Sequence, residues 1–310
     1  MDEYIKRLVH VIRNGAMENT YKMAWARSIV EYCCLNDSTD IIHFDELAPL
    51  IFKYYWDQTI YFDLRQGPQI KKPPVIHQLV KNRIESYQLE CGYQPQKFLS
   101  VQSKINIPIR EISKACKQDV CHRFPKVGDS YYDLYELDKN NLTIGISKPS
   151  LIKDYSDLLF ELINYRWTQK LEEFNNVPRV SLKVRGTDRE IIRRKSLIKY
   201  RKYLDIENPE RLSFISENKI PINELSIDHV IPWSYMFSDD LWNLVYVNKS
   251  ENSSKNNRLP DETSITKLEK RNKRLLKLVR ERNVKSNDIE DLKLSISKDY
   301  VRSYWISYKG

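Results

Sequence analysis

One run of sequence, residues 225–260, combines short apolar segments with charged and amide side chains at their ends. Leu225 to Ile231 alternates apolar and polar residues and stops at Pro232, which predicts a short strand. Asn243 to Val247 is a second strand-like segment, and Ser250 to Arg258 is a polar segment that suits a short exposed helix. The order strand, loop, strand, helix predicts a ββα unit.

Five polar side chains in this run fit the chemistry of phosphodiester hydrolysis, which needs an activated water and charge relief on the phosphate oxygens. We predict His229 as the general base, because a neutral imidazole titrates near working pH. Asp228 and Asn252 carry hard oxygen ligands of the kind that Mg²⁺ prefers. Asn243 is expected to hold the imidazole in one tautomer, and Lys255 to point its ammonium at the phosphate.

The run resembles the HNH (ββα-metal) endonuclease superfamily in its Asp-His…Asn…Asn order. The spacing also agrees, with fifteen residues from Asp228 to Asn243 and nine from Asn243 to Asn252. On this resemblance Asn252 replaces the final His of the motif. The resemblance implies hydrolysis of phosphodiester bonds in DNA, with one divalent cation (Mg²⁺ or Mn²⁺) and 5′-phosphate products.

Many bacterial members of that superfamily carry two Cys pairs that bind a structural zinc. The corresponding positions here are Ser213, Ser216, Asn248 and Glu251, which include no thiolate. We therefore expect no structural zinc. Apolar packing is expected to brace the unit instead, through Leu212, Phe214, Ile215 and Ile220.

Basic residues concentrate on both sides of the motif in a chain of net charge +9. Residues 179–202 hold ten Lys and Arg against two acids, and residues 267–285 hold nine against two. Such flanking segments can cradle a polyanion, although a solvated helix face has the same composition. The residues that we expect to bind nucleic acid are Lys255, Arg258, Arg193, Arg194, Lys195, Lys270 and Arg274.

The second basic segment also has apolar residues at helical spacing, which predicts an amphipathic helix packed on the core with a basic outer face. These apolar residues are Leu268, Leu275, Leu276 and Val279. Binding to a membrane surface is the competing use of such a helix. Because no lipidation motif or apolar span accompanies it, we expect no membrane partner.

Outside the motif the chain is predicted to be helical, with only seven glycines. Helices are expected over Phe44–Trp56, Val75–Leu89 and Leu151–Phe174. Segments Tyr131–Leu137 and Leu142–Ile146 flank a turn sequence and predict a hairpin. The expected fold class is mainly α with a small α+β part.

The turn-forming residues 175–178 follow the last of these helices and predict a domain boundary. Residues 1–176 are expected to form a helical accessory domain that recognises a DNA feature or docks a partner. Residues 179–310 are expected to form the HNH nuclease domain, with its motif core at residues 225–260.

Five cysteines without repeated spacing and an N-terminus without a signal-peptide pattern predict a cytoplasmic protein. A restriction or antiphage nuclease is the expected role, with a defence-system partner protein. A homodimer is expected, because cutting both strands calls for two active sites. The alternatives are a nucleic-acid-binding protein whose HNH unit no longer cuts, and an RNA-directed nuclease toxin.

Overall fold

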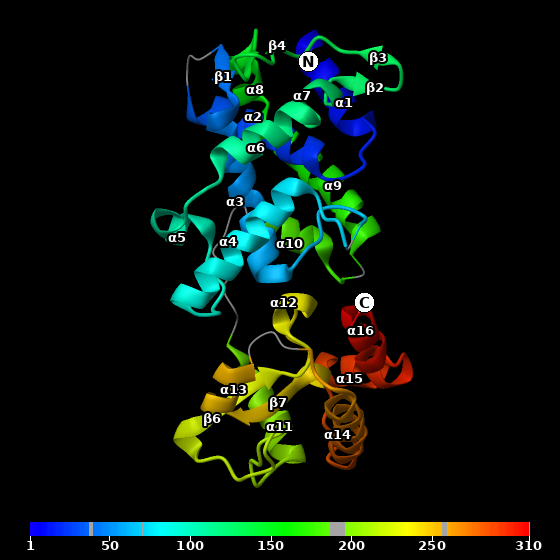
Figure 1. Cartoon of the computed structure of the whole chain (residues 1–310). Coiled ribbons are helices and arrows are strands. Elements are labelled where there is room, and N and C mark those ends of the chain that lie inside the picture. The colour runs from blue at the N-terminus through cyan, green and yellow to red at the C-terminus, as the bar shows by residue number, and fades with distance from the viewer. Residues whose placement is uncertain (37–39, 70, 176, 187–195, 256–258, 310) are drawn as a thin grey trace. The chain divides into compact units, whose positions relative to one another are not determined.

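The structure is a computed structural model that describes residues 1–36, 40–69, 71–175, 177–186, 196–255 and 259–309. It comprises two compact units (Figure 1). The first is Met1–Asn175 with Val180–Ile191, and the second is Asn176–Arg179 with Ile192–Gly310. Helices dominate both units and the strands are short, which confirms the predicted fold class. Within the described ranges, no helix is both long enough and apolar enough to cross a membrane.

The first unit consists mainly of helices with two small antiparallel sheets. The helices are α1 (Glu3–Asn14), α2 (Tyr21–Leu35), α3 (Phe44–Phe62), α4 (Val75–Cys91), α5 (Phe98–Val101), α6 (Ile109–Gln118), α7 (Val120–Arg123), α8 (Pro149–Asp154), α9 (Ser156–Phe174) and α10 (Val180–Gly186), with a 3-10 turn, η1 (Gln102–Lys104). The strands are β1 (Ile41–His43), β2 (Lys126–Val127), β3 (Ser130–Tyr131), β4 (Glu136–Asp138) and β5 (Thr143–Gly145).

Helix α2 is central to the first unit and packs against α3, α8 and α9. Its Trp25 is fully buried, as are Trp56 of α3 and Trp167 of α9. The predicted hairpin is β4 and β5, and β1 pairs with the far side of β5. We did not predict β1, because a strand of three residues has too little alternation to be distinguished from a loop.

The predicted helix over Leu151–Phe174 is in fact two helices, α8 and α9, which meet at Tyr155. The predicted helix over Phe44–Trp56 continues as α3 to Phe62, because its last turns are also buried. Burial of this second half is a tertiary property that the local pattern did not reveal.

Helix α10 belongs to the first unit, whereas the predicted boundary assigned it to the nuclease domain. It packs against α9 and α3, and Val180 and Val184 are buried. Lys183 is also buried, with its Nζ 5.7 Å from the centroid of the Phe62 ring. The chain therefore contributes Asn176–Arg179 to the second unit before it returns to the first.

The second unit has one two-stranded sheet and several helices. Its helices are α11 (Arg201–Glu207), α12 (Trp233–Met236), α13 (Lys249–Lys255), α14 (Glu262–Glu281), α15 (Asn287–Ser297) and α16 (Tyr300–Lys309). Its 3-10 turns are η2 (Leu197–Tyr200), η3 (Ile222–Glu224) and η4 (Leu241–Asn243), and its strands are β6 (Leu225–His229) and β7 (Leu244–Asn248).

Strands β6 and β7 pair antiparallel, with Asp228 opposite Val245 and His229 opposite Leu244. Helix α13 follows β7 directly and packs on both strands. The predicted ββα unit is therefore confirmed, with boundaries close to those expected from the sequence.

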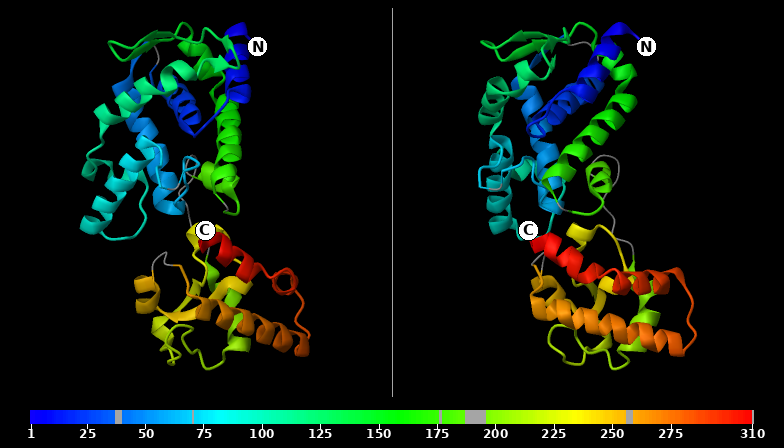
Figure 2. Two further views of the ribbon diagram at one scale, coloured as in Figure 1. Left: turned by 45° about the vertical axis from the view of Figure 1, so that its right-hand side comes forward. Right: turned by 90° about the vertical axis from the view of Figure 1, so that its right-hand side faces the viewer.

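Helix α14 packs one face on the core of the second unit and lies beside α16 (Figure 2). The four apolar residues predicted for its inner face are all buried. Arg271 and Asn272 are buried on the same face, so Arg271 is not part of the basic outer surface that we predicted.

Candidate active site

Asp228 and His229 are the last two residues of β6, and their side chains lie on opposite faces of the strand. Asp228 shares its face with Ser226, and α13 covers both residues. Lys255 donates from Nζ to Asp228 Oδ2 at 2.8 Å, and Asn252 donates from Nδ2 to Ser226 Oγ at 3.3 Å. Asp228 and Asn252, the two predicted metal ligands, therefore both lie where α13 packs on β6.

The Lys255 ammonium contacts Asp228 and also donates to the backbone oxygen of His229. The side chains of this ion pair are 18% and 13% exposed for Lys255 and Asp228. In the structure this ammonium pairs with the Asp228 carboxylate, and its expected contact with a phosphate stays a prediction. A cation thus already lies against the carboxylate that we predicted as a metal ligand.

His229 is buried, and its ring contacts a residue that we did not predict. Nε2 lies 3.0 Å from Oδ1 of Asp239, which is in the loop between α12 and η4. An ionised carboxylate only accepts hydrogen bonds, so this contact places the ring proton on Nε2. Nδ1 is then the nitrogen with a free lone pair, and it has no hydrogen-bond partner among the described residues.

Asn243 contacts the backbone of Ile231 instead of the imidazole. Its Oδ1 accepts the Ile231 N–H at 2.8 Å, and its Nδ2 donates to the Ile231 oxygen at 2.8 Å. Both residues are buried, so water cannot replace these bonds. Asn243 braces the loop that follows His229, and the predicted contact between its amide and the imidazole is wrong in this structure.

Helix α14 holds the segment that carries Asn243. Arg271 donates to the backbone oxygens of Leu241 and Leu244, and Asn272 donates to that of Trp242 at 2.8 Å. Burial lowers the pKa of Arg271 to about 10, because the protein interior disfavours the charged form. These two buried polar residues satisfy carbonyls on both sides of Asn243.

The donor set at Asp228 and Asn252 fits a hard divalent cation. Asp228 supplies a carboxylate that already faces a cationic group, and the Oδ1 of Asn252 has no partner within the described ranges. Both are oxygen ligands of the kind that Mg²⁺ and Mn²⁺ bind, and neither is a soft thiolate. Among the described residues, no group of three or more His, Cys, Asp and Glu side chains could hold a metal ion.

Ser213, Ser216, Asn248 and Glu251, the four positions that we compared with a structural zinc site, form a hydrogen-bonded cluster around Glu251. Its Oε2 accepts the Ser213 hydroxyl at 2.5 Å and the Asn248 N–H at 3.0 Å. Burial opposes ionisation of Glu251, but hydrogen bonds from Ser213, Ser216 and Asn248 outweigh it and lower the pKa of the carboxyl. Of the apolar residues predicted to brace the unit, Ile220 is buried in the core and Phe214 packs against that core, whereas Ile215 is 49% exposed and does not contribute.

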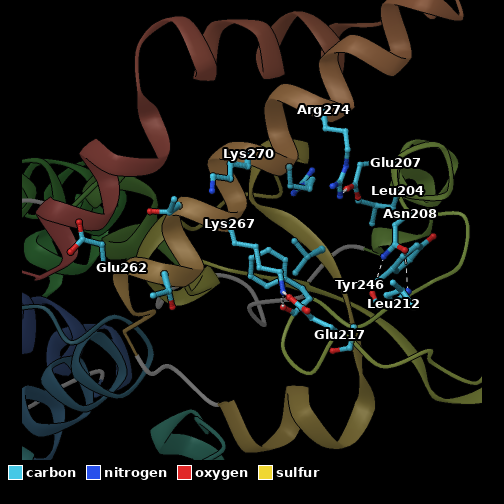
Figure 3. Close-up of a pocket in the computed structure, with 16 residues that line it drawn as sticks. Leu204, Glu207, Asn208, Leu212, Glu217, Tyr246, Glu262, Lys267, Lys270 and Arg274 are labelled. Atoms are coloured by element: carbon cyan, nitrogen blue, oxygen red, sulfur yellow. Dashed lines mark hydrogen bonds and ion pairs between the residues drawn. The ribbon is translucent and has the colours of Figure 1, made fainter.

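The predicted nucleic-acid-binding residues lie in several places. Arg193, Arg194, Lys195 and Arg258 lie outside the described residues. Lys270 and Arg274 of α14 line a cavity of about 810 Å³. Figure 3 shows both side chains among the residues of its lining. Arg274 pairs with Glu207, while Lys270 has no partner in the part of the chain that the structure describes. None of the predicted catalytic or metal-binding residues lines this cavity, which is therefore separate from the candidate active site.

Comparison with known proteins identifies one family. Residues 213–261 match the family model described as HNH endonuclease. This segment runs from Ser213 to Asp261 and includes β6, β7 and α13. No curated protein and no solved structure matches the chain.

Proposed function

We propose that this chain, whose residues 213–261 form an HNH endonuclease domain, is a divalent-metal-dependent nuclease that hydrolyses phosphodiester bonds of DNA. The observation that carries the proposal is that one ββα unit holds His229, the pair Asp228 and Asn252, and Lys255. It combines a base with a free ring nitrogen, a carboxylate and amide pair for a metal, and a lysine beside that carboxylate.

His229 accepts the proton of the attacking water at Nδ1. Asp239 is a positioning residue, because its carboxylate keeps the ring proton on Nε2 and stabilises the imidazolium that forms after proton transfer. Asn243 keeps the loop after His229 in place through Ile231. Asp239 thus holds the imidazole directly, and the bonds between Asn243 and Ile231 join the two ends of the loop between β6 and β7.

Asp228 and Asn252 would hold the divalent cation through their side-chain oxygens. When bound, the cation supplies charge relief at the phosphate and at the leaving 3′ oxygen. Lys255 neutralises Asp228 in the structure and becomes available to a phosphate when Asp228 binds another cation. Because the site has a single carboxylate and this carboxylate is paired with a lysine, its local charge does not repel a polyanion.

The test is cleavage of plasmid DNA, single-stranded DNA and RNA by the purified chain and by His229→Ala, each with Mg²⁺, with Mn²⁺ and with EDTA. We expect metal-dependent cutting of DNA by the wild type and none by the variant. Preferential cutting of RNA would favour the RNA-directed alternative. Binding of DNA without cutting under any of these conditions would favour the binding protein with a silent HNH unit.

The role in restriction or antiphage defence, with a defence-system partner protein, is also proposed from the kind of domain. A homodimer is also proposed, because cutting both strands requires two active sites. Light scattering of the full chain with and without a DNA duplex tests the dimer. A single copy per duplex together with double-strand cutting would contradict it.

A further inference from the structure

Helix α13 carries Asn252 and Lys255 but lacks an apolar anchor. It has seven residues, and none of them is buried. A helix this short is not stable alone in water, so contacts with the rest of the unit must fix its position. Those contacts also determine where Asn252 presents its side-chain oxygen.

Glu251 makes the contacts that fix the first turn of this helix. Its carboxylate accepts the N–H of Asn248, the residue before the helix, at 3.0 Å, as in a capping box. The same oxygen accepts the hydroxyl of Ser213 at 2.5 Å. Ser213 lies 38 positions away in the chain, so this bond ties α13 to a distant loop.

Ser213 is itself held firmly. It is 3% exposed, and its Oγ accepts the N–H groups of Ile215 at 3.1 Å and Ser216 at 3.3 Å. The neighbouring Phe214 N–H donates to the Tyr246 oxygen of β7 at 2.8 Å. A continuous set of hydrogen bonds therefore leads from β7 through this loop to Glu251.

The other contacts of α13 are weaker or more flexible. Asn252 donates to Ser226 at 3.3 Å, which is long for a hydrogen bond. Lys249 and Lys255 reach their acceptors through long side chains with several rotatable bonds. The contact of Glu251 with Ser213 is shorter than that of Asn252 with Ser226 and involves a less flexible side chain than the lysine contacts. Glu251 is also adjacent in sequence to Asn252.

We propose that Glu251, held by Ser213, is a positioning residue that sets the orientation of Asn252 toward the divalent cation. This inference rests on the proposed function, because it requires metal binding by Asp228 and Asn252. Hydrogen bonds to ligand-bearing segments typically change metal affinity about 10- to 100-fold when they are removed. The carboxylate acts through Asn252 and does not touch the cation.

The test is the Mn²⁺ affinity of the full chain, measured by calorimetry for the wild type, Glu251→Ala and Ser213→Ala. We expect both variants to bind Mn²⁺ about 10- to 100-fold more weakly. Ser213→Thr keeps the hydroxyl and should restore affinity close to the wild-type value. Ser254→Ala is the matched control, because Ser254 is an exposed serine of the same helix that bonds only to the Ser250 oxygen.

Glu251→Ala or Ser213→Ala would overturn the inference if it is folded by circular dichroism and binds Mn²⁺ as tightly as the wild type does. An equal loss of affinity in Ser254→Ala would also overturn it, because any change to the helix would then suffice. Should Glu251→Ala fail to fold, Glu251→Gln and Ser213→Ala decide the question. If the wild type does not bind Mn²⁺, or if Asp228→Ala binds Mn²⁺ as tightly as the wild type does, the proposed metal site itself is wrong.

Discussion

Asn243→Ala separates a bracing role from a catalytic one. In the structure this amide makes two hydrogen bonds of 2.8 Å, one to the N–H and one to the oxygen of Ile231. Ile231 is fully buried, so its two backbone groups would lose partners that water cannot replace. Each buried group left unsatisfied costs about 1–3 kcal/mol, so the variant should lose about 2–6 kcal/mol of unfolding free energy.

Two measurements check this prediction. Urea unfolding of the full chain gives the loss of free energy in the transition of the second unit. Hydrogen exchange of the Ile231 amide reports the bond directly, and its protection should fall in the variant. Cleavage should fall as well, because the loop that carries the Asp239 contact is no longer held.

Asn252→Ala is the comparison variant. Asn252 is only partly buried and makes one bond of 3.3 Å, so we expect a loss of less than about 1 kcal/mol. The reasoning is refuted if Asn243→Ala keeps wild-type stability and Ile231 protection while cleavage disappears. The amide would then act in the chemistry, as the sequence suggested.

Three further predictions concern single side chains. Asp239→Asn should lower kcat about tenfold with unchanged Mn²⁺ affinity, because a neutral amide stabilises the imidazolium of His229 less by about 1.4 kcal/mol; an unchanged kcat would remove Asp239 from the site. Lys255→Met should bind Mn²⁺ about tenfold more tightly, because a divalent cation no longer competes with the ammonium on Asp228, and weaker binding would refute that competition. Burial lowers the pKa of His77 from 6.5 to about 3, so the unfolded chain binds a proton below pH 6.5 that the folded chain excludes. The unfolding free energy should therefore fall by about 1.4 kcal/mol per pH unit through His77 as the pH falls from about 6.5 toward 3. When unfolding is measured across this pH range, His77→Phe should flatten the dependence, and a slope identical to that of the wild type would contradict the assignment.

The sequence alone was sufficient for the ββα unit. Alternation in β6 and the polar run of α13 are local patterns, so they predict both the elements and the residues that they carry. The inner face of α14 was predicted for the same reason, since four apolar residues at helical spacing define one stripe. Asp228 and Asn252 could therefore be proposed as a pair before their geometry was known.

The hydrogen-bond partners depended on the tertiary structure. Asp239 beside His229, Ile231 beside Asn243 and Glu251 beside Ser213 are contacts between residues 10 to 38 positions apart. Periodicity shows which face of an element a polar side chain occupies, but it does not show what lies opposite that face.

The same limit explains the buried Arg271 and the place of α10. A charged residue inside a basic run has the local pattern of a solvated face. The carbonyls of Leu241 and Leu244 and the charge of Glu207 compensate the burial of Arg271, and the local pattern shows none of them. Helix α10 lies within another basic run, yet Val180 and Val184 pack it onto the first unit. Local sequence determined the ββα unit, the inner face of α14 and the candidate chemistry, whereas the hydrogen-bond partners were determined by the contacts that folding creates.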